Sequence, residues 1–146
     1  MKKRALLAAS FLSFGRLSFG GLLSAGLLFP SAARAGKPRI GRTEIFLRDG
    51  TSPLIAVPST ALAIKLVAEI FDVPVGARLV ANWVIVKADG VRPNTPVSTL
   101  VIPITQANTN SATFSINNSG PWPVGEYRVD LMINDTPVTD VPYQVV

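Results

Sequence analysis

The chain contains no histidine and no cysteine. Without histidine there is no imidazole base for acid-base catalysis near neutral pH. Without cysteine there is no thiolate nucleophile and no disulfide, and the usual zinc, haem and iron-sulfur sites lose their ligands. Several enzyme chemistries are therefore excluded, and the fold must be held together by a hydrophobic core without covalent cross-links.

Acidic residues are absent from the beginning of the chain, where positive charge is concentrated. The net charge is +5, but five of the 14 basic residues lie before residue 36 and all nine acidic residues lie at or beyond Glu44. The segment after Ala35 therefore has no net charge. Because nucleic-acid binding depends on a basic surface, we expect no nucleic-acid partner.

The first 35 residues have the layout of a secretory signal peptide. A basic start at residues 2–4 is followed by an apolar stretch over residues 17–29, and Ala33-Arg34-Ala35 fits the small-x-small cleavage rule. Cleavage after Ala35 leaves residues 36–146 as the exported domain, periplasmic or secreted, with no membrane span. Since small secreted eukaryotic domains usually carry disulfides, the lack of cysteine favours a bacterial envelope protein.

A retained membrane anchor over residues 5–29 is the alternative interpretation of the same segment. Its length is sufficient to cross a bilayer. Arg16 lies at its middle, however, where a charged side chain costs about 2.5 to 3.5 kcal/mol to insert. This cost favours a cleaved signal peptide.

Residues 36–146 are predicted to form one all-β domain. Scattered prolines argue against long helices, and short alternating runs are separated by turn signals. Seven strands are expected, at 42–48, 62–71, 78–87, 99–105, 112–116, 126–133 and 137–146. The side chains expected to face the core include Leu62, Ile64, Leu66, Ala68, Ile70, Leu79, Ala81, Trp83, Ile85, Tyr127, Val129, Leu131 and Ile133. Pro103 marks the fourth strand as an edge or bulged strand.

Two motifs carry a family resemblance. Trp83 lies in the middle of the third expected strand, and Gly125-Glu126-Tyr127-Arg128-Val129 enters the sixth. This arrangement resembles an antiparallel immunoglobulin-like β-sandwich, of the disulfide-free, fibronectin-III-like kind found in bacterial extracytoplasmic proteins. The resemblance implies that Trp83 packs across the core and that Tyr127 forms a tyrosine corner. It also places Val129 where an antibody domain has its second cysteine.

A second part of the resemblance is the stretch from Trp122 to Leu131. It looks like a W-P-x-G-x-Y-x-V-x-L ending of bacterial extracytoplasmic accessory domains. Because immunoglobulin-like domains share no activity, the resemblance implies only a binding or spacing role.

The third strand supplies a candidate partner surface. If Trp83 faces the core, then Val80, Val84 and Val86 form an outward apolar stripe, to which Met132 on another strand can add. A contiguous exposed patch of this kind is typical of a docking surface. The alternative is that valine is present as a good strand former.

Trp122 lies between two prolines on an expected loop and has two interpretations. An exposed ring would serve as a sugar-stacking or protein-docking anchor. A buried ring would cap the open end of the sandwich.

No catalytic, cofactor or metal site is expected. Glu126, Arg128 and Asp130 share the outward face of one strand and are interpreted as solvated charge pairing. The aspartates Asp72, Asp89, Asp135 and Asp140, in expected loops or near strand ends, could supply oxygen ligands for calcium. Because they form no dense cluster, turn chemistry is the favoured explanation.

These observations predict an exported, non-catalytic adaptor module that binds another envelope or cell-surface protein through a sheet face or an edge strand. The alternative is a module that binds carbohydrate or another surface ligand through Trp122. The oligomeric state is left open.

Overall fold

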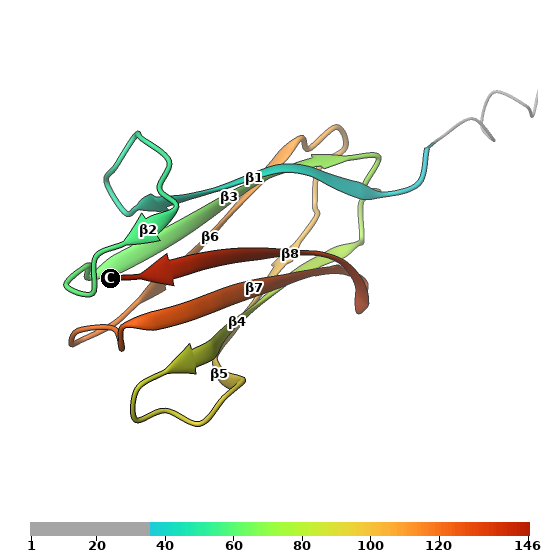
Figure 1. Cartoon of the computed structure of the whole chain (residues 1–146). Helices are drawn as coiled ribbons and strands as arrows, with labels where there is room; N and C mark the ends of the chain where they lie inside the picture. Colours follow the sequence, from blue (N-terminus) through green and yellow to red (C-terminus); the bar gives the residue numbers. More distant parts are fainter. Residues whose placement is uncertain (1–35) are drawn as a thin grey trace, which may run out of the picture. The chain divides into compact units, whose positions relative to one another are not determined.

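The computed structural model describes residues 36–146, which fold into two β-sheets packed face to face (Figure 1). The signal peptide expected in residues 1–35 lies outside the described residues. Within the described part, no helix is long and apolar enough to cross a membrane. The strands are β1 (Arg39–Leu47), β2 (Ala56–Val57), β3 (Ala63–Phe71), β4 (Arg78–Ala88), β5 (Thr95–Pro103), β6 (Ser111–Asn117), β7 (Gly125–Ile133) and β8 (Thr136–Val145).

The strands divide into a three-stranded sheet, β1-β3-β6, and a five-stranded sheet, β2-β8-β7-β4-β5. All pairs are antiparallel except β2 with β8, which run parallel over two residues. The first part of the chain thus contributes to both sheets, β1 to one and β2 to the other. The predicted all-β sandwich is confirmed, and β5 lies at a sheet edge as Pro103 indicated.

The strand predictions differ from the structure in strand bounds, in strand number and at Leu62. β5 spans Thr95–Pro103 where 99–105 was predicted, and β1 begins at Arg39 where residue 42 was predicted. The sequence predicted seven strands, and the short β2 is the additional one. Leu62 was expected in the core but is 72% exposed. It precedes β3, which begins at Ala63, and its carbonyl accepts a hydrogen bond from the Asn118 amide. Leu62 thus lies just outside the strand, and its side chain is exposed.

The core lies between the two sheets and is almost entirely apolar. Trp83 on β4 is fully buried and meets Phe114 on β6 edge to face, with ring centroids 6.4 Å apart. Its register partner on β7 is Val129, which is also fully buried. The core packing implied for Trp83 is confirmed, and Val129 fills with methyl groups the place where an antibody domain has a cysteine.

The turn into β7 contains the expected tyrosine corner. Tyr127 Oη donates a hydrogen bond to the Pro123 carbonyl at 2.7 Å. The ring also packs at 5.4 Å from the ring of Tyr143 on β8. At the other end of β7, Asn134 and Asp135 form the hairpin turn to β8, with φ of 51° and 69°. Asparagine and aspartate tolerate these positive values, as the sequence predicted.

Gly125 permits a close backbone approach at the start of β7. A Cβ atom there would lie 2.1 Å from the Lys87 carbonyl oxygen and 2.8 Å from Ala88 Cα. Both are backbone atoms of the neighbouring strand, so neither can turn aside. The glycine therefore allows β7 to pair with the end of β4.

Replacing Gly125 with alanine is expected to lower the free energy of unfolding by about 2 kcal/mol or more, because β7 and β4 must separate locally. Gly120→Ala is the matched control, since a Cβ at Gly120 meets nothing within 4 Å. Urea unfolding of both variants measures the difference. Equal stability of the two variants would contradict this account of the close approach.

Tyrosine ionisation is expected to destabilise the fold at alkaline pH. Burial raises the pKa of Tyr127 to about 12, and burial also raises the pKa of Tyr143. Because unfolded tyrosine titrates near 10, the folded state retains protons that the unfolded state has lost, and the free energy of unfolding falls as pH rises above about 10. Tyr127→Phe should lose about 1 kcal/mol at neutral pH and show a shallower alkaline decline. Thermal melts across pH 7 to 12 measure both effects; a steeper decline in the variant would contradict them.

Candidate functional site

The outward valine stripe is only partly formed. Val84 and Val86 on β4 and Met132 on β7 are half-buried, but Val80 is 4% exposed, so the expectation that it lies open on the sheet face is wrong. Val80 occupies a central strand, and its register neighbours are Val101 on β5 and Met132 on β7. These flanking side chains enclose it.

Trp122 is a core residue, and the interpretation as an exposed anchor is wrong. Its side chain is 4% exposed, and its indole Nε1 donates to the Ala61 carbonyl at 2.6 Å. Its backbone amide also donates to the Ser59 carbonyl at 2.8 Å. The indole therefore ties the loop before β7 to the segment before β3 and closes this end of the sandwich.

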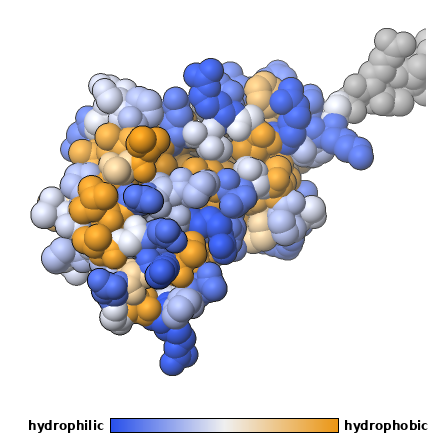
Figure 2. All heavy atoms as spheres, in the orientation of Figure 1, coloured by the Kyte–Doolittle hydropathy of each residue, from blue (hydrophilic) through white to orange (hydrophobic). Residues whose placement is uncertain are grey.

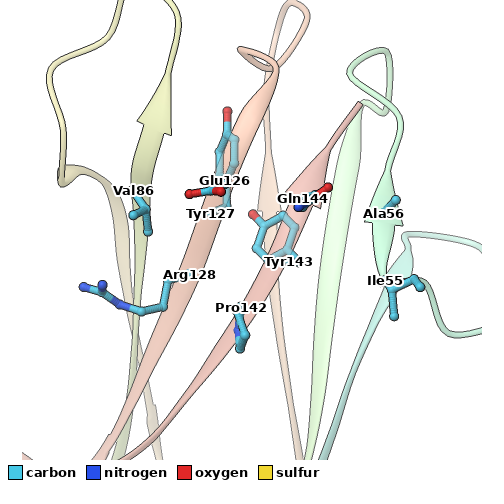
Figure 3. A pocket seen from close by; sticks show the side chains of 9 residues that line it. All are labelled: Ile55, Ala56, Val86, Glu126, Tyr127, Arg128, Pro142, Tyr143 and Gln144. Carbon is cyan, nitrogen blue, oxygen red and sulfur yellow. The ribbon is translucent and has the colours of Figure 1, made fainter.

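The outer face of the five-stranded sheet carries a hollow on the side of β2 and β8. We call it the Ile55 groove; its volume is about 630 Å³ (Figure 3). Side chains from four adjacent segments converge on it, with Val86 on β4, Arg128 on β7, Pro142 on β8 and Ile55 just before β2. The full lining comprises Ile55, Ala56, Val86, Glu126, Tyr127, Arg128, Pro142, Tyr143 and Gln144.

Ile55 gives this groove an exposed apolar wall. Its side chain is 90% exposed although the residue is fixed in place, because the Ile55 carbonyl accepts a hydrogen bond from the Gln144 amide. Figure 2 shows hydrophobic residues gathered on the side of the molecule where β2 and the end of β8 lie in Figure 1. With Val86 and Pro142, which line the same hollow, Ile55 forms an apolar group on this face, and contiguous apolar patches are typical of contact surfaces.

A second hollow lies on the same sheet face, of about 500 Å³, and is lined in part by Asn82, Met132 and Val138. Arg128 and Asp130 also line it. Arg128 thus belongs to both hollows, which makes it the central polar side chain of the face.

Arg128 is held in place by a two-point ion pair with Asp130. Arg128 Nε lies 2.6 Å from Asp130 Oδ1, and Nη2 lies 3.1 Å from Oδ2. The hydrogen bond to Asp130 and its negative charge raise the pKa of Arg128, and Asp140 adds a smaller effect in the same direction. About a third of each side chain is exposed, so the pair contributes little to stability but fixes the guanidinium plane.

The sequence predicted part of this surface and missed the rest. Val84, Val86 and Met132 lie on the expected face, and Glu126, Arg128 and Asp130 point outward as expected. The residues missed are Ile55, Ala56, Pro142 and Gln144, which meet only because β2 pairs with β8. A two-residue parallel pairing between distant segments leaves no periodic signal that could have revealed it.

No metal site forms among residues 36–146, in that no group of three or more histidine, cysteine, aspartate or glutamate side chains is arranged to hold an ion. Of the four aspartates considered as calcium ligands, Asp72, Asp89 and Asp135 lie in bends or turns and Asp140 lies on β8. Asp135 pairs with Arg78 at 2.8 Å.

Comparison with solved structures decides the fold. An immunoglobulin-like protein from Pseudomonas aeruginosa superposes with a TM-score of 0.53 at 15% identity, covering 77% of this chain and 99% of that one. The described residues form an immunoglobulin-like domain. In this domain, β4 takes the place of strand C and β7 that of strand F, so that Trp83 and Tyr127 occupy the positions the fold reserves for them.

A second solved structure, the PmoD soluble domain from a Methylocystis species, matches with a TM-score of 0.44 at 16% identity, covering 76% of this chain and 94% of that one. No protein-family model matches the sequence, and no curated protein matches it significantly.

Tryptophan fluorescence is expected to report two buried indoles in the immunoglobulin-like domain. Since Trp83 and Trp122 are both buried, native emission should be blue-shifted and poorly quenched by acrylamide. Trp122→Phe should lower stability by about 1 to 3 kcal/mol, because the Ala61 carbonyl loses its indole donor. An easily quenched native component that disappears in Trp122→Phe would contradict the buried placement.

Proposed function

We propose that this chain is an exported, non-catalytic immunoglobulin-like adaptor that binds another protein of the cell envelope. The binding surface is the outer face of the five-stranded sheet, centred on the Ile55 groove. The observation that carries the proposal is the 90% exposure of Ile55 at the wall of a groove built on four neighbouring segments.

The apolar part of the surface supports protein binding. Ile55, Val86 and Pro142 present hydrocarbon around the groove, and Met132 and Val138 present it around the second hollow. Protein interfaces have apolar centres with polar surroundings and gain most of their affinity from a few buried anchors. Ile55 fits the role of such an anchor, because its 90% exposed side chain would bury a large apolar area on binding.

The polar part of the surface supports specificity. The Arg128 guanidinium is fixed by Asp130, and Glu126 and Gln144 lie at the same groove (Figure 3). Groups held on paired strands need little reordering when a partner binds, which lowers the entropic cost of association. A partner must therefore match an ordered pattern of positive and negative charge as well as the apolar wall.

Export to the envelope is supported by the sequence. The basic start, apolar stretch and small-x-small site of residues 1–35 are typical of a secretory signal. A non-catalytic role is supported by the lack of histidine and cysteine in the chain and by the pairing of Asp130, at the second hollow, with Arg128. With Trp122 buried, no observation favours the carbohydrate-binding alternative.

Ile55→Lys is expected to abolish partner binding without loss of stability, since the side chain it replaces is already exposed. Val84→Lys tests the same face from β4. Leu62→Lys is the matched control, because Leu62 is also an exposed aliphatic residue and lies outside both hollows. Tagged protein is recovered from the envelope fraction, and stoichiometric partners are identified by mass spectrometry.

The proposal requires a stoichiometric envelope protein that binds wild type and Leu62→Lys but not Ile55→Lys. Retention of the partner by Ile55→Lys and Val84→Lys, with both variants folded, would overturn the assignment of the face. Recovery of the protein without any envelope protein would overturn the adaptor role.

A further inference from the structure

A long charge-free stretch covers one lateral side of the domain. From Pro93 to Gly125 the chain contains no lysine, arginine, aspartate or glutamate. This stretch includes β5, the edge strand of the five-stranded sheet, and β6, an edge strand of the other sheet. Figure 1 shows β5 at the outer margin of its sheet. Natural edge strands are protected from pairing with other chains by charges, prolines or bulges. β5 has Pro96, Pro103 and a register irregularity near its start, but the segment between the two prolines carries no charge.

The backbone of β5 offers hydrogen-bonding groups on its open side. The Ile104 amide donates to the Ala77 carbonyl at 2.9 Å, so the backbone groups of Ile104 point toward β4. These directions alternate along an antiparallel strand, and the register pairs Ile102 with Leu79 and Leu100 with Ala81. Leu100 and Ile102 therefore also face β4. Thr99 and Val101 direct their N–H and C=O groups outward, and among residues 36–146 β4 is the only strand that pairs with β5.

The other edges of the described domain are less suited to pairing. β1 carries Arg39, Arg42 and Glu44. The part of β8 that β2 does not cover is interrupted by Pro137 and Pro142, which have no N–H to donate. The exposed side chains of β6 are serine, threonine and asparagine, which water solvates well. On β5, in contrast, Val97 and Val101 are exposed, and Val101 is 49% exposed.

We infer that β5 pairs with β5 of a second copy of this chain, antiparallel and about a two-fold axis. The register that uses every available donor places Thr99 opposite Val101 of the second copy, and Leu100 opposite Leu100. Each Thr99–Val101 pair exchanges two N–H···O bonds. A register centred one residue further along, with Val101 opposite Val101, would place Thr99 opposite Pro103, which has no N–H to donate. Pro96 and Pro103 thus bound the paired segment on both sides.

A second copy fits this edge better than a charged partner. In a two-fold antiparallel pair each side chain meets a neighbour from the same short segment, so any charge would lie close to its own copy and be repelled. Residues 96–103 carry no charge, and their β-branched side chains pair favourably across strands. Leu100 and Ile102 are partly buried against the core, and pairing would remove more of their surface from contact with water.

Such pairing joins two five-stranded sheets into one continuous sheet. A two-fold axis between antiparallel strands is perpendicular to the sheet, so both outer faces point the same way. The Ile55 groove extends from β2 to Val86 on β4, includes no residue of β5, and remains open in each copy. The inference is independent of the proposed partner, and the dimer would present two copies of the groove side by side.

Sedimentation equilibrium of the purified chain over a range of concentrations tests the inference. Wild type should form a dimer of twice the chain mass, and Val101→Lys should raise the dimer dissociation constant by at least about tenfold, since it places a charge in the paired segment. Thr113→Lys is the matched control, because Thr113 is an exposed threonine on the β6 edge. It should dimerise like wild type.

Val101→Pro is the second variant, because it removes an outward-facing donor while every hydrogen bond of the ladder with β4 keeps its N–H. Amide exchange provides a readout that does not depend on any variant: the Thr99 and Val101 amides should exchange more slowly as concentration rises, while those of Thr113 and Ser115 do not. A monomer at every concentration would overturn the inference. So would a dimer that both Val101 variants retain, or one that Thr113→Lys also abolishes.

Discussion

The burial of Trp83 between the two sheets is the contact on which the rest of the domain depends. With no cysteine in the chain, the sheets are joined by apolar packing and not by a disulfide. Trp83 lies in the middle of β4, packs against Phe114 of the opposite sheet, and has Val129 as its neighbour on β7. Interiors of this kind are close-packed, so the position of each strand follows from how these side chains fit together.

That inner packing determines what the outer face can present. Side chains alternate along β4, β7 and β8, so once Trp83, Tyr127 and Tyr143 are committed to the interior, Val84, Arg128 and Pro142 must face outward. Trp122 and the tyrosine corner close one end of the sandwich and hold the loop before β7 in place. The outer face is therefore an ordered surface, and the groove beside Ile55 is built from strands that the core has already fixed.

Most of the fold could be predicted from the sequence, because period-two alternation and turn residues are local signals. The cores of β3, β4 and β7, the edge position of β5 and the Asn134-Asp135 hairpin all followed from them. The exceptions have physical causes: β2 is formed by a distant two-residue pairing, Leu62 lies just before its strand, and Val80 is enclosed by Val101 and Met132. The groove was missed for the same reason as β2, since Ile55 and Gln144 are brought together by that pairing.

The central claim is that the outer face of the five-stranded sheet is the surface that binds a partner. Amide chemical shifts of the isotope-labelled protein, recorded as the co-purified envelope protein is added, test it most directly. The account predicts that shifts concentrate at Val86, Arg128, Gln144 and the residues around Ile55, while β1, β3 and β6 are unchanged. Shifts confined to the three-stranded sheet would contradict it.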